Sequence, residues 1–284
     1  MAKFDLHLHT SNSDGSDTAK ELVSKIIEEG IDIFSVTDHD TTEGALETSK
    51  IVPKDKKFIL GVELTCKTDD VKCHILGYGY NPNDDGLYKL IDKGKILRRQ
   101  KLETRIEYLK KVWNIYLTQE ELDWLYSRNS VVKTHFANIL VSRGLAEDNV
   151  SAMAKYLDGC KTGNTRFDGR EAISTLKNAG AIVVWAHPLG GEGEKHDTKE
   201  EFLPKLETMT DAGIQGLECY YSRYNMEEIS FLIECANKYN LYITGGSDWH
   251  GTNKTVPLGR LNCKNIFIDS SKINLPIISN PLAE

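Results

Sequence analysis

Short apolar segments that predict β-strands recur along this chain, and most are followed by a segment with the pattern of an amphipathic helix. The predicted strands cover residues 3–8, 31–36, 58–62, 71–80, 181–185, 214–218 and 241–244, with one more at 266–268. Repeated strand–helix units produce a parallel sheet, and functional sites in such sheets form at the carboxyl ends of the strands. The clusters of His, Asp and Glu fall at those ends or within 71–80, a segment that looks antiparallel. This coincidence favours an α/β barrel over an open sheet.

A block of helices interrupts the alternation. Helices are predicted at 88–113, from the capping box Thr118–Glu121 onward, at 133–143 and at 149–157, with no strand between them. We therefore expect a barrel formed by residues 1–93 and 166–284, with residues 94–165 inserted as a helical cap. Within the barrel, a helix at 18–29 should be capped by Ser16 or Asp17 and end at Gly30.

Composition excludes several classes of protein. The chain has 284 residues, 40% hydrophobic and 27% charged, which suits one large soluble domain. No apolar run approaches the roughly 20 residues of a membrane span, and the start of the chain does not resemble a signal peptide. The six cysteines contain no CxxC pair, so we expect reduced thiols in a cytoplasmic protein. A net charge of −7 argues against stable binding of duplex nucleic acid.

Imidazoles and carboxylates gather at the predicted strand ends. A lone histidine there is usually structural, and a lone aspartate is as often a helix cap, but structural needs do not place so many at one rim. The set combines ligands that suit Zn²⁺, Mn²⁺ or Fe²⁺ and is too large for one ion. Two or three ions about 3.5–4 Å apart can hold a hydroxide at neutral pH and clamp a phosphoryl group. The residues are His7, His9, His39, His187 and His250, with Asp5, Asp14, Asp38, Asp40, Glu63 and Asp248.

These motifs resemble the PHP (polymerase and histidinol phosphatase) family over the whole predicted barrel. The matching segments, in order, are His7-x-His9, 13–15, 37–40, 61–63, His74, 186–188 and 246–250. The resemblance implies a distorted (β/α)7 TIM-like barrel with a trinuclear metal site. It also implies which residues share an ion: His7, His9, Glu63 and Asp248 at the first, Glu63, His74 and His187 at the second, and Asp14, His39 and His250 at the third.

The inserted helices resemble those of small-molecule phosphoesterases in this family, some of which hydrolyse nucleoside monophosphates, 3′,5′-bisphosphates or short oligoribonucleotides. The segment 93–111 is strongly basic, and Arg98 or Arg99 is the expected phosphate contact. His135 lies at the start of a predicted helix, whose amino terminus suits an anion. Arg223 follows a strand and could contact the phosphate or its neighbour. A solvated basic face would explain much of the same pattern.

We therefore expect a phosphatase or phosphodiesterase that uses two to three Mn, Fe or Zn ions and a metal-bridging hydroxide. The expected catalytic residues are Glu63 as the bridging ligand, with His39, His250 or a metal-bound water as the proton donor. The first alternative is a histidinol-phosphate phosphatase, although the basic cap favours a substrate with more than one phosphate. A non-catalytic PHP module and a metal-dependent amidohydrolase are further alternatives, but the ligand set is complete and no predicted strand ends in Lys.

Overall fold

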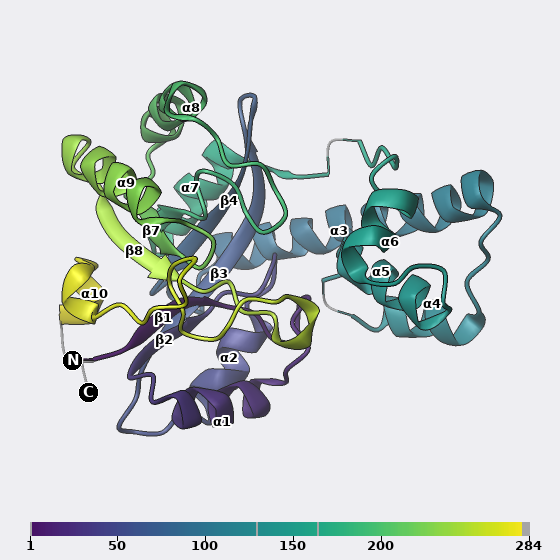
Figure 1. Cartoon of the computed structure of the whole chain (residues 1–284), viewed down its shortest axis with the longest axis horizontal. Coiled ribbons are helices and arrows are strands. Elements are labelled where there is room, and N and C mark those ends of the chain that lie inside the picture. Colours follow the sequence, from purple (N-terminus) through teal and green to yellow (C-terminus); the bar gives the residue numbers. More distant parts are fainter. Residues whose placement is uncertain (1, 129, 164, 280–284) are drawn as a thin grey trace.

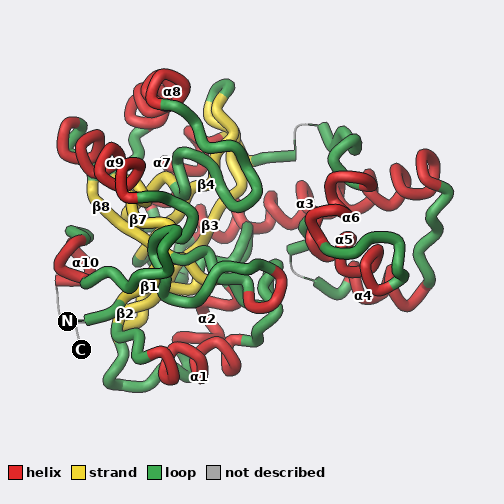
Figure 2. The backbone as a smooth tube through the Cα atoms, in the orientation of Figure 1, coloured by secondary structure: helices red, strands yellow, loops and turns green. Residues whose placement is uncertain are grey.

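The computed structural model describes residues 2–128, 130–163 and 165–279, and a mixed β-sheet forms its centre (Figures 1 and 2). The strands are hydrogen-bonded in the order β1-β2-β3-β4-β6-β7-β8, and β5 pairs with β3 off this path. The pairs that β4 makes with β3 and β6 are antiparallel, and the other pairs are parallel. Their bounds are β1 Phe4–Leu8, β2 Ile33–Val36, β3 Lys57–Thr68, β4 Val71–Tyr78, β5 Phe167–Asp168, β6 Ile182–Trp185, β7 Gly216–Tyr221 and β8 Tyr242–Gly246.

The first and last strands meet, so the sheet forms a nearly closed barrel. The backbone N–H of Asp248 donates to the carbonyl of His7 at 2.9 Å, and that of His9 donates to the carbonyl of Trp249 at 2.9 Å. Gly246 permits this approach, because a Cβ at that position would lie 2.2 Å from the Cβ of His7. The predicted barrel with a helical insertion is therefore confirmed. The first motif, His7-x-His9, and the last, 246–250, lie side by side.

Helices cover the outside of the barrel (Figure 1). Their bounds are α1 Ala19–Glu29, α2 Glu43–Ser49, α7 Gly169–Asn178, α8 Lys199–Ala212, α9 Met226–Lys238 and α10 Pro276–Ser279, with 3-10 turns at Gly251–Asn253 and Ser270–Lys272. Among the described residues, no helix combines the length and apolar character needed to cross a membrane.

The cap of α1 differs from the sequence prediction. Thr18, rather than Ser16 or Asp17, forms the capping box with Glu21, and Gly30 ends the helix in a left-handed conformation. The two expected caps bind elsewhere: Asp17 accepts hydrogen bonds from Trp249 and Lys25, and Ser16 accepts one from the backbone of Thr252.

The helical insertion lies between β4 and β5 and projects to one side of the barrel (Figures 1 and 2). It consists of α3 Asp85–Trp113, α4 Gln119–Tyr126, α5 Lys133–Ser142 and α6 Asn149–Tyr156. Leu87 and Leu90, in the first turns of α3, pack in the barrel core, whereas Leu102 and Leu109 belong to a separate core with Phe136. Because α3 runs unbroken through residue 94, the boundaries 94–165 stay a prediction.

The strand predicted at 266–268 is wrong. This segment is irregular, and only the adjacent Asp269 forms an isolated bridge, with Lys3. Asn262 accepts hydrogen bonds from the backbone of Lys264 and Ile266, which curls the chain before the segment. The ring of Phe267 packs under Lys3, whose ammonium lies 3.9 Å from its centre. Side-chain contacts, and not the hydrogen bonds of a β-ladder, therefore hold this segment.

Candidate metal centre

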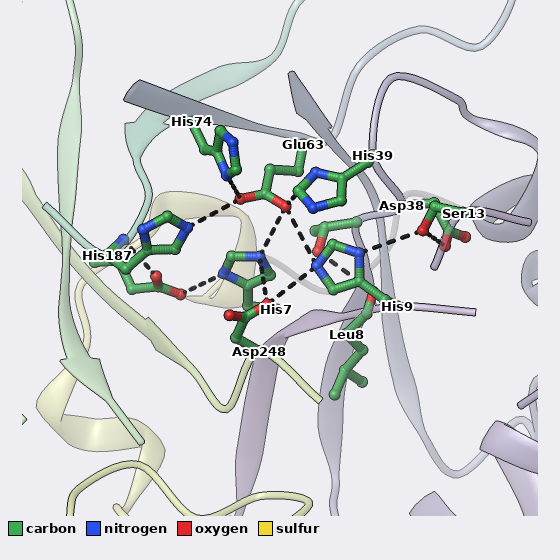
Figure 3. A network of polar contacts seen from close by, with 12 residues as sticks. His7, Leu8, His9, Ser13, Asp38, His39, Glu63, His74, His187 and Asp248 are labelled. Atoms are coloured by element: carbon green, nitrogen blue, oxygen red, sulfur yellow. Dashed lines mark hydrogen bonds and ion pairs between the residues drawn. The ribbon is translucent and has the colours of Figure 1, made fainter. Parts of the chain in front are cut away.

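The structure brings the nine predicted metal ligands together at one end of the barrel. Figure 3 labels seven of them: His7, His9, His39, Glu63, His74, His187 and Asp248. They come from β1, β3 and β4 and from the loops that follow β1, β2, β6 and β8. In three overlapping groups, the ligand atoms lie within 4.8 Å of one another. The groups are His9, Asp14, His39 and His250; His7, His9 and Glu63; and His39, Glu63 and His74.

The two remaining ligands lie against these groups. His187 Nε2 is 3.3 Å from Glu63 Oε1, and Asp248 Oδ1 is 3.3 Å from His9 Nε2. The grouping overlaps with the assignment implied by the family resemblance but divides the ligands differently. Which ligands share an ion stays a prediction.

Several of the loops at this end hold a non-glycine residue in the left-handed region. The φ angles are 54° at Asp40, 28° at His187 and 60° at Asp248. Such a conformation costs roughly 1–2 kcal/mol at a residue with a Cβ. The contacts around the site must therefore hold these turns in place.

Glu63 lies at the centre of the site and is fully buried. Burial raises the pKa of its carboxyl, but His39, His7 and His74 outweigh burial and hold this pKa well below its usual value. A carboxylate that faces imidazoles on several sides has the position that a bridging ligand requires. The nitrogen atoms that lie 2.9–3.3 Å from its two oxygens belong to His7, His9, His39, His74 and His187.

The donor set fits divalent cations. Five buried polar atoms in the site form no hydrogen bond among the described residues, although each lies 2.9–3.3 Å from another ligand atom: Nε2 of His7, His9 and His250, Nδ1 of His39 and Oε2 of Glu63. Each such atom costs about 1–3 kcal/mol when it stays unpaired, and buried polar groups in native proteins are nearly always satisfied. Several metal ions held by these atoms would satisfy the whole set.

A second layer of residues orients the ligands. His7 Nδ1 lies 2.9 Å from Glu218 Oε1, and the other oxygen of Glu218 accepts the backbone N–H of His187 at 2.7 Å. His250 Nδ1 lies 2.8 Å from the carbonyl of Asp248. A histidine that donates one ring N–H to an oxygen presents the lone pair of its other nitrogen to a metal. Both Nε2 atoms thereby face the centre.

Three of the strand-end aspartates hold loops together. Asp38 accepts hydrogen bonds from the Thr10 backbone and hydroxyl and from the Ser13 hydroxyl, at 2.5–2.8 Å. Asp5 accepts the backbone N–H groups of Ser247 and Gly259 at 2.8 and 2.9 Å, and burial raises its pKa to about 6. The third, Asp40, pairs with Arg98 on α3.

The buried charges compete with desolvation at each imidazole. Burial disfavours the charged form of His9, but Asp248 and Glu63 outweigh burial and raise its pKa to about 9. Burial prevails at His74 and His250 and lowers both pKa values to about 4. Metal ligation requires neutral imidazole. At neutral pH, His9 would therefore have to lose a proton before it binds an ion, whereas His74 and His250 would not.

The predicted substrate contacts already have partners in the structure. Arg98 is buried; its Nε donates to Asp40 at 2.5 Å and its Nη2 to Thr65 at 2.7 Å. Arg223 pairs with Glu192 and with Thr255. The roles of both arginines in phosphate binding stay predictions.

His135 lies at the start of α5 and is buried. Its Nδ1 accepts the backbone N–H of Val132 at 3.1 Å, and burial lowers its pKa to about 4. The Asp14 carboxylate and the Ser13 backbone both act to raise this pKa, so His135 lies near the loop that carries these two residues. The structure therefore brings His135 next to the centre, and its contact with phosphate stays a prediction.

Sequence reasoning missed Glu218 and Lys254. Glu218 is an isolated carboxylate within the apolar strand β7, a pattern that could have marked it as facing a charged site. Lys254 Nζ lies 2.7 Å from Asp248 Oδ2, which Tyr221 also contacts at 3.1 Å. No local pattern distinguishes Lys254, because it lies in a loop that only the fold returns to the centre.

Comparison with known proteins shows the family. The PHP domain model matches residues 5–165, more than half of the chain, so the chain belongs to the PHP family. This membership makes it a metal-dependent phosphoesterase, a hydrolase.

Particular relatives cover most of the chain. A 3′,5′-nucleoside bisphosphate phosphatase of Chromobacterium violaceum is 26% identical over 258 residues, covering 88% of each chain. A 5′-3′ exoribonuclease of Haemophilus influenzae is 26% identical and covers 91% of this chain and 93% of its own. A structure assigned as a metal-dependent phosphoesterase of Bifidobacterium adolescentis superposes with a TM-score of 0.78 at 26% identity, covering 95% and 94%.

Proposed function

We propose that this phosphoesterase hydrolyses small nucleotides: nucleoside 5′-monophosphates, nucleoside 3′,5′-bisphosphates or short oligoribonucleotides. The observation that carries the proposal is the set of nine ligands, seven of which are buried, with ligand atoms that gather in three overlapping groups. Two relatives that match along most of the chain are named for nucleotide substrates.

Divalent ions held by the nine ligands would supply a nucleophile generated from water at neutral pH and neutralise charge on the phosphoryl oxygens. The chain's own part is to fix the positions of these ions. Glu63 would bridge two of them, since both of its oxygens face imidazoles. Glu218 orients His7, and Lys254 and Tyr221 hold Asp248.

A small cavity gives access to this centre. Its volume is about 130 Å³, and His39, His74, His187, Asp248 and Lys254 are among the residues that line it. This volume suits a phosphate group rather than a whole nucleotide, so the rest of the substrate would lie outside. His39 lines the cavity and His250 does not, so His39 is the predicted catalytic imidazole that a substrate would meet.

Phosphate release from a panel of substrates tests the proposal. The panel contains AMP, adenosine 3′,5′-bisphosphate, a short oligoribonucleotide and histidinol phosphate, each with Mn²⁺ and with a chelator. We expect metal-dependent release from the nucleotides and little from histidinol phosphate. Preference for histidinol phosphate would overturn the nucleotide assignment and retain the metal centre, whereas release that persists with chelator would overturn the role of the ions.

A further inference from the structure

A second cavity, of about 700 Å³, lies where the inserted helices meet the edge of the barrel. Its lining includes Lys or Arg side chains at seven positions and, within the described residues, no Asp or Glu. They come from the β3–β4 hairpin and from α3 and α5, and the last two are Lys161 and Arg166. We propose that this cavity binds a second phosphate group of the substrate, remote from the one being hydrolysed. The proposal rests on the proposed function.

Arg105 is the strongest indication of a ligand. This side chain of α3 is only 7% exposed, yet its Nε and Nη1 atoms have no hydrogen-bond partner in the described part of the chain. A buried guanidinium without a counter-ion is costly. Its planar array of donors matches a phosphate group bidentately. Nε and Nη1 lie on different edges of the guanidinium, so an anion from outside the chain would satisfy one of these two open nitrogens.

Lys101 lies one turn earlier on α3 and faces the same cavity. It is 6% exposed, and no ion pair or hydrogen bond is found for it among the residues described. Burial and the nearby Arg98, together with Arg166 and Arg105, lower its pKa to about 7, although Asp40 acts in the opposite direction. Mutual repulsion of this kind is relieved when an anion enters between the cations.

A neighbouring cavity lies between this cavity and the metal centre. Lys72 and Arg166 line both the 700 Å³ cavity and a neighbouring cavity of about 180 Å³ that reaches His74 and His187. Lys72 and His74 are two residues apart on β4, so their side chains point to the same face of the strand. The basic cavity is therefore on the side of the metal centre where β4 carries both Lys72 and His74.

This arrangement selects a class of substrate. A monophosphate fills the metal centre alone, whereas a nucleoside bisphosphate or an oligoribonucleotide carries a further phosphate for the basic cavity. We expect the enzyme to prefer polyphosphorylated nucleotides over AMP, and we expect the preference to fall with added salt, because each phosphate contact displaces counter-ions.

Steady-state kinetics of the metal-loaded enzyme test this inference. Arg105→Gln should raise the KM for a 5′-phosphorylated tetraribonucleotide about tenfold more than the KM for AMP, the usual scale for a lost charged hydrogen bond. Lys111→Gln is the matched control, since Lys111 is on the same helix, exposed and paired with Glu107 at 3.1 Å. Equal changes of KM for the two substrates, or no change, would overturn the inference.

A binding measurement separates this inference from the proposed function. Tripolyphosphate is titrated calorimetrically into the metal-free protein, whether or not any nucleotide is hydrolysed. Wild type should bind it at least tenfold more tightly than Arg105→Gln or the double variant Lys72→Gln/Lys161→Gln, which changes only exposed lining residues and keeps the test valid if Arg105→Gln misfolds. Undiminished binding by the double variant would exclude the cavity as the site.

Discussion

Replacing Lys101 by Met should stabilise the protein at neutral pH. The pKa of Lys101 falls from its ordinary 10.5 to about 7 in the folded chain. Between these values the unfolded chain binds a proton that the folded chain does not, so the stability contributed by Lys101 falls as the pH drops from about 10.5 to 7. At about 1.4 kcal/mol per pKa unit, the cost at pH 7 reaches about 4 kcal/mol.

This cost is an upper limit, because water and local relaxation reduce it. Methionine keeps the volume of the side chain and removes the charge, so we expect a gain of about 1–3 kcal/mol. Urea denaturation of both proteins at pH 6, 7, 8 and 9, with chelator throughout, measures it.

The dependence on pH distinguishes the proposed cause from better packing. The gain should be nearly constant at pH 6–7 and should shrink toward pH 9, because removing the proton that the unfolded chain binds costs less as the pH approaches 10.5. Lys111→Met, on the exposed side of α3, should change stability by less than about 0.5 kcal/mol. A Lys101→Met protein that is less stable than wild type, or a gain that does not vary with pH, would refute the reasoning.

Three further predictions concern the metal centre and its support. Glu63→Gln should abolish phosphate release and lower the metal content measured by elemental analysis, with the circular dichroism spectrum unchanged; full activity would contradict the bridging role. Arg98→Ala should lower the free energy of unfolding by about 3 kcal/mol, because Asp40 stays buried without its partner; unchanged stability with a raised KM would support phosphate contact instead. Saturating Mn²⁺ should raise the Tm of chelator-treated protein by about 5 °C, and an unmoved Tm would count against metal binding in the folded state.

The barrel could be predicted from the sequence because each of its strands and helices has a pattern within a short segment of the chain. Each strand is a short apolar run, and the change to a helical block after β4 is visible as a loss of strand patterns. The two-residue β5 is too short to leave a pattern. The segment 266–268 has the apolar content of a strand, but hydrogen bonds from Asn262 and packing of Phe267 decide its conformation.

In the site, too, local patterns mark some residues, whereas contacts between distant residues leave no local pattern. His7, His9 and Glu63 could be proposed as ligands because the ends of predicted strands mark them, whatever their distant neighbours are. The contacts that orient them are not local: His7 and Glu218 are 211 positions apart, and Arg98 and Asp40 are 58 apart. The sequence of a basic helix also gives no sign that one of its cations, Arg98, is paired inside the protein, and the contact of Arg98 with phosphate stays a prediction.

The unbroken course of α3 has a mechanical consequence. A helix of 29 residues is about 44 Å long at 1.5 Å per residue, and its base is clamped in the barrel core. At Gly94 the helix lies so close to the barrel edge that a Cβ would come within 2.5 Å of the Phe167 ring. The inserted helices are therefore joined to the barrel on one side by a continuous helix and not by a loop at each side. A sharp bend in this helix would break backbone hydrogen bonds. Substrates of different length would therefore have to be accommodated by side chains near the start of α3 and not by movement of the inserted helices.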